Sequence, residues 1–437
     1  MASYALVVGL IMLIGMIVLM TFGVPVSISL GLPAAISIAV ILGSDKAALT
    51  SAQRTLTGVD SFPLLAIPLF VLAGVIMNNG GIASRLVDMA KVLVGRLPGS
   101  LAHTNVVANM MFGSISGSAL AGAAAVGSTM APIQKKEGYD PGFSSAANVA
   151  SAPSGMLIPP SNTLIVYSLV SQASVGALFL AGYIPGILWG LTCMAMIWWY
   201  ARGKPELKSS EKVTAKIFVT TFLRALPSLL LVLIVIGGIV GGFFTATEGS
   251  AVAVLYALVL SFIYRTIKVS DLYHILLNAT RTSSVVIFLI GVSSIMSWIM
   301  AFTKIPQLIA SGLFGWTDNK VIVLVLMMLV LLIIGIPLDA TPAVLIFTPI
   351  FLPIAVSYGI HPVHFGIMLV FNMCLAVISP PSAPVLFVGA KVAGLTVEQV
   401  IRPLMPFFIA LCVMLLIIAF VPAFSMWLPT VAGLVGP

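Results

Sequence analysis

The sequence predicts an all-α polytopic membrane protein built from two repeated halves, each with a helical hairpin and a broken helix. Three observations lead to this class. Hydrophobic residues make up 60% of the 437-residue chain and charged residues 7%, whereas soluble domains carry roughly 25% charged residues. Many apolar stretches approach the ~20 residues that cross a bilayer as a helix, without the alternation of a membrane β-barrel. Finally, Pro-Pro-Ser interrupts a long apolar stretch twice, at 159–161 and at 380–382.

The two Pro-Pro-Ser sequences predict breaks inside membrane helices. Proline lacks a backbone N–H and interrupts a helix. Within a bilayer, the backbone groups freed in this way persist only where protein or a polar cavity satisfies them. Two broken helices at corresponding positions of two halves indicate the binding site of a secondary transporter.

Apolar stretches predict membrane spans near 4–24, 25–43, 62–78, 174–200, 217–242, 246–265, 283–303, 321–335 and 404–428. The first stretch has neither a basic n-region nor a cleavage sequence, so we expect a retained helix rather than a signal peptide. The segments 84–100 and 266–282 are charged and amphipathic, and we expect both to lie along the membrane interface.

Two shorter apolar pieces precede each break, at 101–113 and 118–132 and again at 321–335 and 340–354. At ~1.5 Å per residue, a piece of about 15 residues covers about 22 Å, which is less than the ~30 Å hydrocarbon core. Each pair is therefore expected to form a re-entrant hairpin, about 101–132 and about 321–354. The broken helices are expected at about 144–170 and about 364–393.

A constant difference of 221 in residue number (353 − 132) relates the two halves, and we call it the repeat offset. It aligns prolines of the first half with prolines of the second: Pro132 with Pro353, Pro141 with Pro362, Pro159 with Pro380, Pro160 with Pro381 and Pro185 with Pro406. The loop 133–143 contains two lysines, whereas the matching loop 354–364 has no Lys or Arg. The positive-inside rule places the first loop in the cytoplasm and the second outside, so we expect an inverted repeat. The basic linker 201–216 is expected in the cytoplasm as well.

These boundaries divide the chain into scaffold and repeat units. Scaffold helices are expected at 1–83 and 217–265. Repeat one, with its interfacial arm, hairpin and broken helix, is expected at 84–200, and repeat two at 266–437.

The tip of the first hairpin, Gly113-Ser-Ile-Ser-Gly-Ser-Ala119, carries hydroxyls and carbonyls that can replace the water shell of a cation. The helix that begins after the tip also offers the N–H groups of its N-terminus to an anion. The alternative is that these small residues merely permit close helix packing.

The second tip contains Asp339. A carboxylate inside the membrane costs about 2.5–3.5 kcal/mol even on the forgiving insertion scale, so we expect it to be functional. Thr341 and the carbonyls near Gly335 and Pro337 are expected companions in a cation site. The alternative is that Asp339 caps the helix that starts at Ala340, and both roles can hold together. Glu248, another acid in an apolar setting, has either a structural role at a helix start or a role in transport.

Other classes of function find little support. Cys193, Cys374 and Cys412 are scattered in apolar sequence and indicate neither a disulfide framework nor a metal site. The four histidines form no metal-binding motif, and there is no phosphate-binding loop. The net charge is +8, and Arg202, Lys204, Lys208, Lys212 and Lys216 gather in the linker rather than in a soluble domain. We therefore expect no catalytic residue, transition metal, organic cofactor or nucleic-acid partner.

Several motifs, in order and spacing, resemble the large membrane subunit of tripartite ATP-independent periplasmic (TRAP) transporters: Asp60–Phe70, Gly113–Ala119, Pro159–Ser161, Thr245–Glu248, Asp339 and Pro380–Ser382. The resemblance implies a sodium-coupled importer of organic acids in the bacterial inner membrane, with an elevator-type fold embedded in lipid. It implies two partners, a small four-helix membrane subunit, here expected as a separate polypeptide, and a soluble periplasmic substrate-binding protein.

The resemblance also implies a set of site residues. One sodium site would use Ser116, Ser118, Ser154, Gly155 and Pro159. The other would use Asp339, Thr341, Ala376 and Ser379, with Gly335 beside them. The organic anion would lie between the tips, near Ser114, Ser161, Asn162 and Ser382.

The sequence leaves the substrate open among a sugar acid, a C4-dicarboxylate, a 2-oxo acid and a sulfonate. A stand-alone divalent-anion/sodium symporter, needing no soluble partner, is the main alternative. An intramembrane enzyme would need a paired nucleophile and base, which the sequence does not contain. A membrane scaffold without transport activity would leave the two broken helices and Asp339 unexplained.

Overall fold

The computed structural model describes residues 2–204, 207, 214–309, 312, 319–336, 338–380 and 383–436. These residues form helices joined by turns, with no β-strand among them. Seven helices in this described part are long and apolar enough to cross a membrane. The all-α class expected from the sequence is thus confirmed.

The first half of the chain forms α1 (Ala2–Thr21), α2 (Val26–Leu42), α3 (Ser44–Val59), the 3₁₀ turn η1 (Phe62–Leu65), α4 (Ala66–Asn79), α5 (Ile82–Val94), α6 (Ser100–Ser116), α7 (Ala119–Lys136), α8 (Pro141–Ser151), α9 (Ser154–Leu157), α10 (Asn162–Ser171) and α11 (Val175–Ala201). The second half forms α12 (Ala215–Val240), α13 (Ala246–Ile263), η3 (Val269–Asp271), α14 (Leu272–Thr303), α15 (Ile305–Ile309), α16 (Lys320–Gly335), α17 (Ala340–Ser357), α18 (Pro362–Ala376), α19 (Pro384–Ala393), α20 (Val397–Phe420) and α21 (Ala423–Val431).

The repeat offset carries most helices of the first half onto helices of the second half. It takes α7 onto α17 with identical bounds, and the other matched pairs are α1 with α12, α2 with α13, α6 with α16, α8 with α18, α10 with α19 and α11 with α20. The packing is reciprocal, because α10 packs on α17 while α19 packs on α7. Likewise α8 packs on α20 while α18 packs on α11. Reciprocal pairs of this kind are what a two-fold axis generates.

One contact lies close to this approximate axis. The thiol of Cys374 donates to the carbonyl oxygen of Pro153 at 3.4 Å. The repeat offset matches these two positions to each other, and equivalent positions touch where they meet an axis of symmetry. The axis therefore passes near the two interrupted helices.

Local chemistry sets the limits of the interrupted helices. Asp140 accepts a hydrogen bond from the Phe143 N–H at 2.6 Å and starts α8, with proline at the first helical position. His361 accepts from the Val363 N–H at 3.1 Å and starts α18 in the same way. α8 is followed by the single turn α9 and, after residues 158–161, by α10; α18 is followed by α19. Every residue of α18 after its first proline is buried, so this helix is part of the core.

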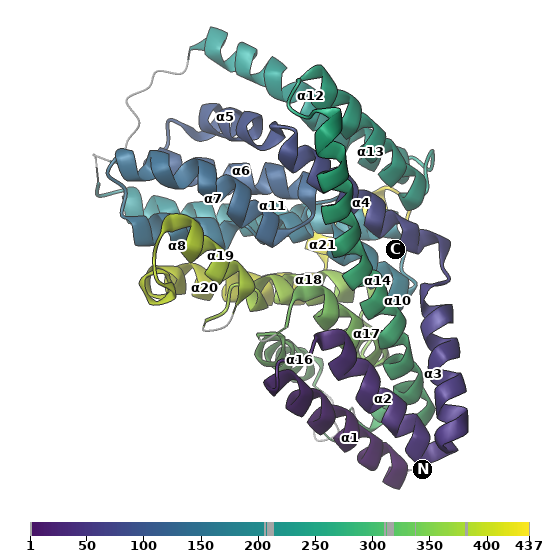
Figure 1. Ribbon diagram of the computed structural model, residues 1–437. Coiled ribbons are helices and arrows are strands. Elements are labelled where there is room, and N and C mark those ends of the chain that lie inside the picture. The colour runs from purple at the N-terminus through teal and green to yellow at the C-terminus, as the bar shows by residue number, and fades with distance from the viewer. Residues whose placement is uncertain are drawn as a thin grey trace.

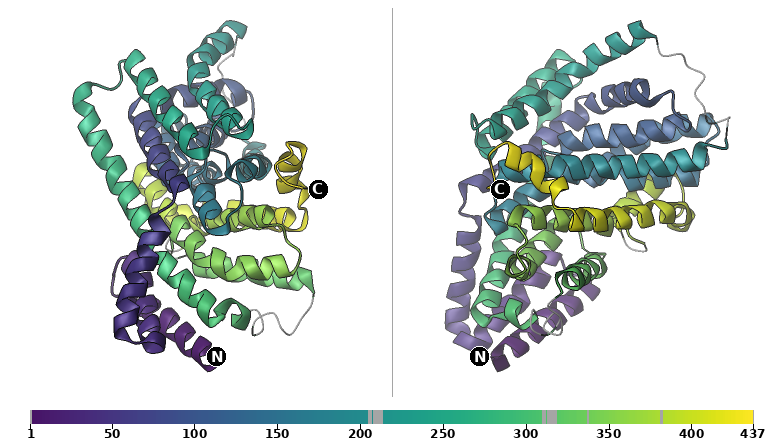
Figure 2. Two further views of the ribbon diagram at one scale, coloured as in Figure 1. Left: turned by 90° about the vertical axis from the view of Figure 1, so that its right-hand side faces the viewer. Right: turned by 180° about the vertical axis from the view of Figure 1, so that it is seen from behind.

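The remaining helices form two arms around this core. One arm comprises α1, α2 and α3, and the other comprises α12 and α13. We count α4 and α14, which pack against each other and against these helices, with the arms. Figure 1 shows α1, α2 and α3 at one end of the molecule and α12 at the opposite end, with α6, α7 and α11 side by side between them. The views in Figure 2 show the same separation, and α14 connects the two regions. α14 packs against α2 and α3 of the first arm and against α4.

Three features of the arms differ from the sequence expectation. The segment 266–282 is not a separate interfacial helix, because most of it continues into the 32-residue α14, which no proline interrupts. α3 was not expected, since it is polar enough to resemble a loop. The last span, expected at 404–428, is two helices, because Pro422 follows the end of α20.

Candidate functional site

A cavity of about 580 Å³ lies where the two helix-turn-helix tips approach α4, α9, α10 and α14. Both tips line it, the first through Ser116 to Ala121 and the second through Asp339 to Thr341. The two tips lie far apart in the sequence and are equivalent in the repeat. The cavity is therefore lined by equivalent turns from the two halves of the chain.

The first tip is the turn between α6 and α7. Gly117 adopts a left-handed φ of 61° and ends α6. Ser118 caps α7 by accepting from the Ala121 N–H at 3.3 Å, and its own N–H donates to the Ser116 hydroxyl at 3.4 Å. Both serines predicted for the first sodium site thus line the cavity, where each already holds a backbone N–H.

Glycines bring this tip against the broken helix. A Cβ added to Gly113 would lie 2.3 Å from the Cα of Gly155, so α6 and α9 are in backbone contact. A Cβ on Gly117 would lie 3.1 Å from the Asn162 N and 3.2 Å from the Pro160 carbonyl oxygen. Asn162 therefore sits directly beside the first tip and lines the cavity.

The second tip is the turn between α16 and α17. Asp339 occupies the N-cap position of α17, yet its carboxylate makes no capping hydrogen bond. Its side chain is exposed to the cavity, together with Thr341. The carboxylate is thus available to a ligand. Gly335 packs against the end of α18, where its added Cβ would lie 3.0 Å from the Cβ of Ala376.

Several predicted site residues lie behind the cavity wall. Ser154 is fully buried and donates to the Ser151 carbonyl oxygen at 2.7 Å. Ser379 is buried and donates to the Leu375 carbonyl oxygen at 3.0 Å. Pro159 and Ala376 are also buried. These four residues and Gly155 do not line the cavity, although their elements adjoin it.

Two residues expected at the substrate have other positions. Ser161 is fully buried and caps α10, since its hydroxyl accepts from the Leu164 N–H and donates to the Met156 carbonyl oxygen. Ser114 lies on another face of the first tip, beside Leu231 and Val235 of α12, and its hydroxyl donates to the Met111 carbonyl oxygen at 2.7 Å. Ser382, the remaining predicted substrate residue, lies outside the described residues, as does Pro337.

The structure adds polar residues from the arms that the sequence analysis did not identify. Asn78 and Asn79 reach the cavity from the end of α4, and Asn278 and Thr282 reach it from α14. The last two are four residues apart and lie on one helix face. Their spacing was present in the sequence, but the segment was expected to lie on the membrane interface.

The electrostatic character of the cavity comes from helix ends as much as from side chains. First-turn residues of four helices line it: α7, α10, α17 and α19. Helix N-termini carry partial positive charge and free N–H groups, which favour an anion. Asp339 is the one charged side chain among the described residues that line the cavity, and no Lys or Arg occurs among them. Ser116 and Val377 come from the C-terminal ends of α6 and α18, where free carbonyl oxygens favour a cation.

Glu248, the other acid considered, has a structural position. It forms a capping box with Thr245, in which the Thr245 N–H donates to the Glu248 carboxylate at 2.8 Å and the Glu248 N–H donates to the Thr245 hydroxyl at 3.3 Å. A capping box satisfies two of the free N–H donors at a helix start. Glu248 therefore stabilises the beginning of α13 and does not line the cavity.

Comparison with known proteins places the chain among membrane permeases. Residues 13–424 match the family described as tripartite ATP-independent periplasmic transporter, DctM component. A protein of Salmonella typhimurium named YgiK is 52% identical over 394 residues, which is 90% of each chain. The 2,3-diketo-L-gulonate TRAP transporter large permease protein YiaN of Escherichia coli is 37% identical, covering 85% of this chain and 87% of its own. The sialic acid TRAP transporter large permease protein SiaM of Vibrio cholerae is 36% identical, covering 89% and 91%.

A solved structure shares the fold. The Alcanivorax borkumensis YdaH transporter superposes with a TM-score of 0.63, at 14% sequence identity, over 86% of this chain and 88% of that one. At this low identity, the similarity concerns the arrangement of helices alone.

Proposed function

The chain belongs to the DctM component family of TRAP transporters, and from this membership we propose that it imports a small organic anion together with sodium ions. Membership makes it a multi-pass protein of the bacterial inner membrane, in agreement with the seven spanning-length helices of its described part. The family consists of permeases rather than enzymes, and it handles small organic anions with the help of a small membrane subunit and a periplasmic binding protein. Sodium coupling, the particular substrate and the particular partners are our proposals.

The observation that carries the proposal is the convergence of both tips on one cavity. An organic anion in this cavity would meet the N-termini of α7, α10, α17 and α19 and the amide side chain of Asn162. No lysine or arginine among the described lining residues would offset its charge. Cations bound beside the anion would supply that charge, which gives a physical reason for cotransport.

Sodium would bind on both sides of the anion. At the first tip, Ser116 and Ser118 would supply oxygens, with carbonyls of the nearby break around Ser154, Gly155 and Pro159. At the second tip, Asp339 and Thr341 would do so, with carbonyls near Gly335, Ala376 and Ser379. Oxygen ligands suit a hard cation of this kind. We expect sodium as co-transported ion and no organic cofactor.

We propose that the helices of the two repeats move the loaded site across the membrane. The helix-turn-helix units and the interrupted helices pack on one another as one body, whereas α4 and α14 contribute to the cavity from the arms. A rigid-body shift of the first group against the arms would carry the cavity across the membrane, as expected for an elevator mechanism and for inverted repeats that alternate access.

The substrate class is proposed as a hydroxylated or oxo-substituted carboxylic acid. The relatives named for 2,3-diketo-L-gulonate and sialic acid act on such anions. The cavity presents four asparagines, Asn78, Asn79, Asn162 and Asn278, whose amides can both donate to carbonyl groups and accept from hydroxyls. Membrane lipid, the small four-helix subunit and a periplasmic binding protein complete the proposed partners.

Uptake in proteoliposomes tests the proposal. The chain and its small membrane partner would be reconstituted with labelled sugar acids, with and without an inward sodium gradient and the binding protein. Uptake that needs both the gradient and the binding protein supports the proposal. Uptake that is indifferent to the sodium gradient contradicts it. Uptake with sodium alone would favour the stand-alone symporter.

A further inference from the structure

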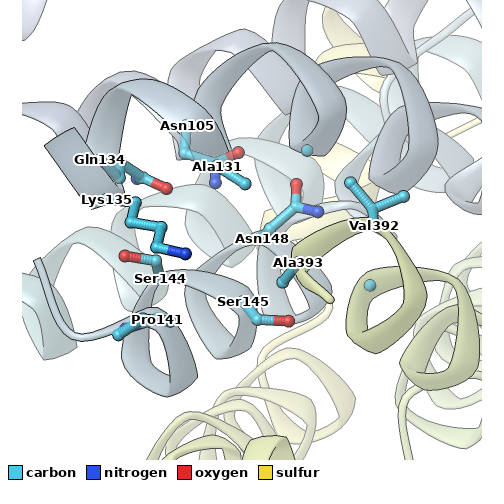
Figure 3. Close-up of a pocket in the computed structure, with 12 residues that line it drawn as sticks. Asn105, Ala131, Gln134, Lys135, Pro141, Ser144, Ser145, Asn148, Val392 and Ala393 are labelled. Atoms are coloured by element: carbon cyan, nitrogen blue, oxygen red, sulfur yellow. The ribbon is translucent and has the colours of Figure 1, made fainter. Parts of the chain in front are cut away.

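A second, much smaller cavity of about 30 Å³ lies behind the first hairpin, between α6, α7, α8 and α19. Figure 3 shows Asn105, Gln134, Ser144 and Asn148 around it, with Val392 and Ala393 of α19 closing one side. Lys135 lies at the rim, and its side chain is exposed. The cavity is large enough for one or two water molecules, since one needs about 10–15 Å³ by this measure.

Three polar atoms around this cavity have no hydrogen-bond partner. They are Nδ2 of Asn105 and the hydroxyl oxygens of Ser144 and Ser145. These side chains are 1%, 4% and 4% exposed. Buried polar groups in proteins nearly always have partners, either protein atoms or ordered water. A polar cavity of sufficient size beside three unsatisfied groups therefore indicates bound water.

A row of buried polar side chains continues from this cavity toward the first tip. The Asn109 amide nitrogen, which carries two hydrogens, has three side-chain acceptors within hydrogen-bond distance: Asn105 Oδ1 at 3.2 Å, Asn148 Oδ1 at 3.0 Å and the Ser151 hydroxyl at 2.8 Å. The carbonyl of Ser151 accepts from Ser154. Ser154 adjoins Gly155, which contacts Gly113 of the first tip. We call this polar row, Asn105, Asn109, Ser144, Asn148, Ser151 and Ser154, the hairpin row.

The other end of the hairpin row lies beside the basic linker. The carbonyl of Leu207, a linker residue, accepts from the Tyr139 hydroxyl at 3.1 Å and from the Gly99 N–H at 3.2 Å. Gln134, which lines the small cavity, donates to the Leu101 carbonyl nearby. The row thus joins the first tip to the linker side of the molecule, the side expected in the cytoplasm.

The second half of the chain shows that this polarity is not a requirement of the fold. At the positions matched by the repeat offset, Asn105, Asn109, Ser144 and Asn148 are replaced by Leu326, Val330, Phe365 and Leu369. Polarity returns only near the break, where Asn372 stands at the position of Ser151. At these matched positions, the same helix arrangement therefore holds apolar side chains in one half and polar side chains in the other.

We propose that the hairpin row is a hydrated passage through which a monovalent cation at the first tip exchanges with solution on the linker side. Hydroxyl and amide oxygens along the row replace part of the water shell of the ion, and the small cavity supplies water at its outer end. That a cation binds at the first tip, and that it is sodium, rests on the proposed function. Access of a small cation along the hairpin row does not, because it can be measured without transport.

Silver ions test the passage, because they are monovalent, small and bind thiols tightly. In a variant lacking the three native cysteines, Ser144→Cys and Ser151→Cys would each be exposed to Ag⁺ without substrate or sodium gradient. Thiols left free would then be counted with a fluorescent maleimide after unfolding. We expect both thiols to be consumed at least tenfold faster than the thiol of Ala355→Cys. Ala355 is fully buried and corresponds to Gln134, so it is the matched control in the apolar half.

A plug tests the direction of entry. Ser144→Val in the Ser151→Cys protein fills the outer cavity, and we expect it to slow the silver reaction at position 151 at least tenfold. An unchanged rate would mean that silver enters from the tip side, and it would overturn the proposal. Equal rates at positions 144, 151 and 355 would overturn it as well. Neither readout requires transport, so failure of the passage is distinguishable from failure of sodium-coupled uptake.

Discussion

Two facing glycines, Gly113 and Gly155, allow the first tip to reach the broken helix. A methyl group on Gly113 would lie 2.3 Å from the Cα and 2.9 Å from the N of Gly155, and backbone atoms cannot move aside locally. Gly113→Ala should therefore push α6 away from α9, at a cost of about 1–3 kcal/mol for overpacking. We expect a lower melting temperature in detergent and reduced uptake. Gly237→Ala is the control, because its added methyl meets no atom within 4 Å. A wild-type melting temperature for Gly113→Ala would contradict this packing argument.

Asp339 offers a separate test, of charge rather than packing. Its carboxylate faces the cavity and makes no capping hydrogen bond, so Asp339→Asn should leave α17 nearly as stable as before. If the carboxylate binds sodium, the variant should need at least tenfold more sodium for half-maximal uptake, because an amide oxygen lacks the full charge. The measurement is uptake against sodium concentration at fixed substrate. Unchanged sodium dependence would remove Asp339 from the proposed ion site.

At the level of residues, the sequence located the tips more reliably than the individual contacts. Hydroxyls beside glycines predicted the first tip, a carboxylate in an apolar stretch predicted Asp339 with Thr341, and the family resemblance singled out Ser116 and Ser118. All four residues line the cavity. Ser161 could not be resolved in this way, because a serine before a helix can cap it or bind a ligand, and the choice depends on the direction of its side chain. Asn78 and Asn278 were not identified from the sequence, because their position at the cavity depends on which helices approach the tips.

Among the elements, α13 provides a test that is independent of transport. Its capping box ties Thr245 to Glu248 at the helix start. Thr245→Ala removes the hydroxyl that accepts the Glu248 N–H, and the loss of such a cap costs about 0.5–2 kcal/mol. We expect a lower melting temperature with unchanged sodium dependence of uptake. Thr57→Ala is the control, since that hydroxyl is exposed and bonds only to carbonyls of the preceding turn. A shift in sodium dependence in Thr245→Ala would return Glu248 to the transport site.

The interrupted helices were predictable as elements, because proline acts locally and leaves a mark in the sequence that needs no knowledge of tertiary contacts. The arms were not predictable to the same degree. α3 carries few apolar residues, and α14 begins in a charged segment before it becomes apolar. Both helices are stabilised by packing against each other and against α2, and that information lies in the fold rather than in either segment.

Considering the whole molecule, the two halves are interleaved rather than placed next to each other. α10 of the first half packs on α17 and α18 of the second, and α19 of the second packs on α7 and α8 of the first. Two glycines make this approach close. An added Cβ on Gly366 would lie 2.3 Å from a ring carbon of Tyr167, and one on Gly389 would lie 2.2 Å from a methyl group of Val149. Each half thus buries its interrupted helix partly against the other half.

This interleaving predicts the behaviour of a divided chain. If the chain is cut within 208–213 and the two pieces are expressed together, they should associate, because the apolar faces of α10 and α19 have their partners on the other piece. An affinity tag on the first piece should recover the second in mild detergent. Each piece expressed alone should be degraded or aggregate, since α18 and α8 would lose the contacts that bury them. Stable, monodisperse single pieces would contradict the interleaved arrangement. Gly366→Leu should weaken recovery of the second piece, because its added side chain would collide with Tyr167. Gly237→Leu is the control, since that glycine lies on an open face of α12, and it should leave recovery unchanged. The comparison separates damage to the shared core from a general effect of a larger side chain.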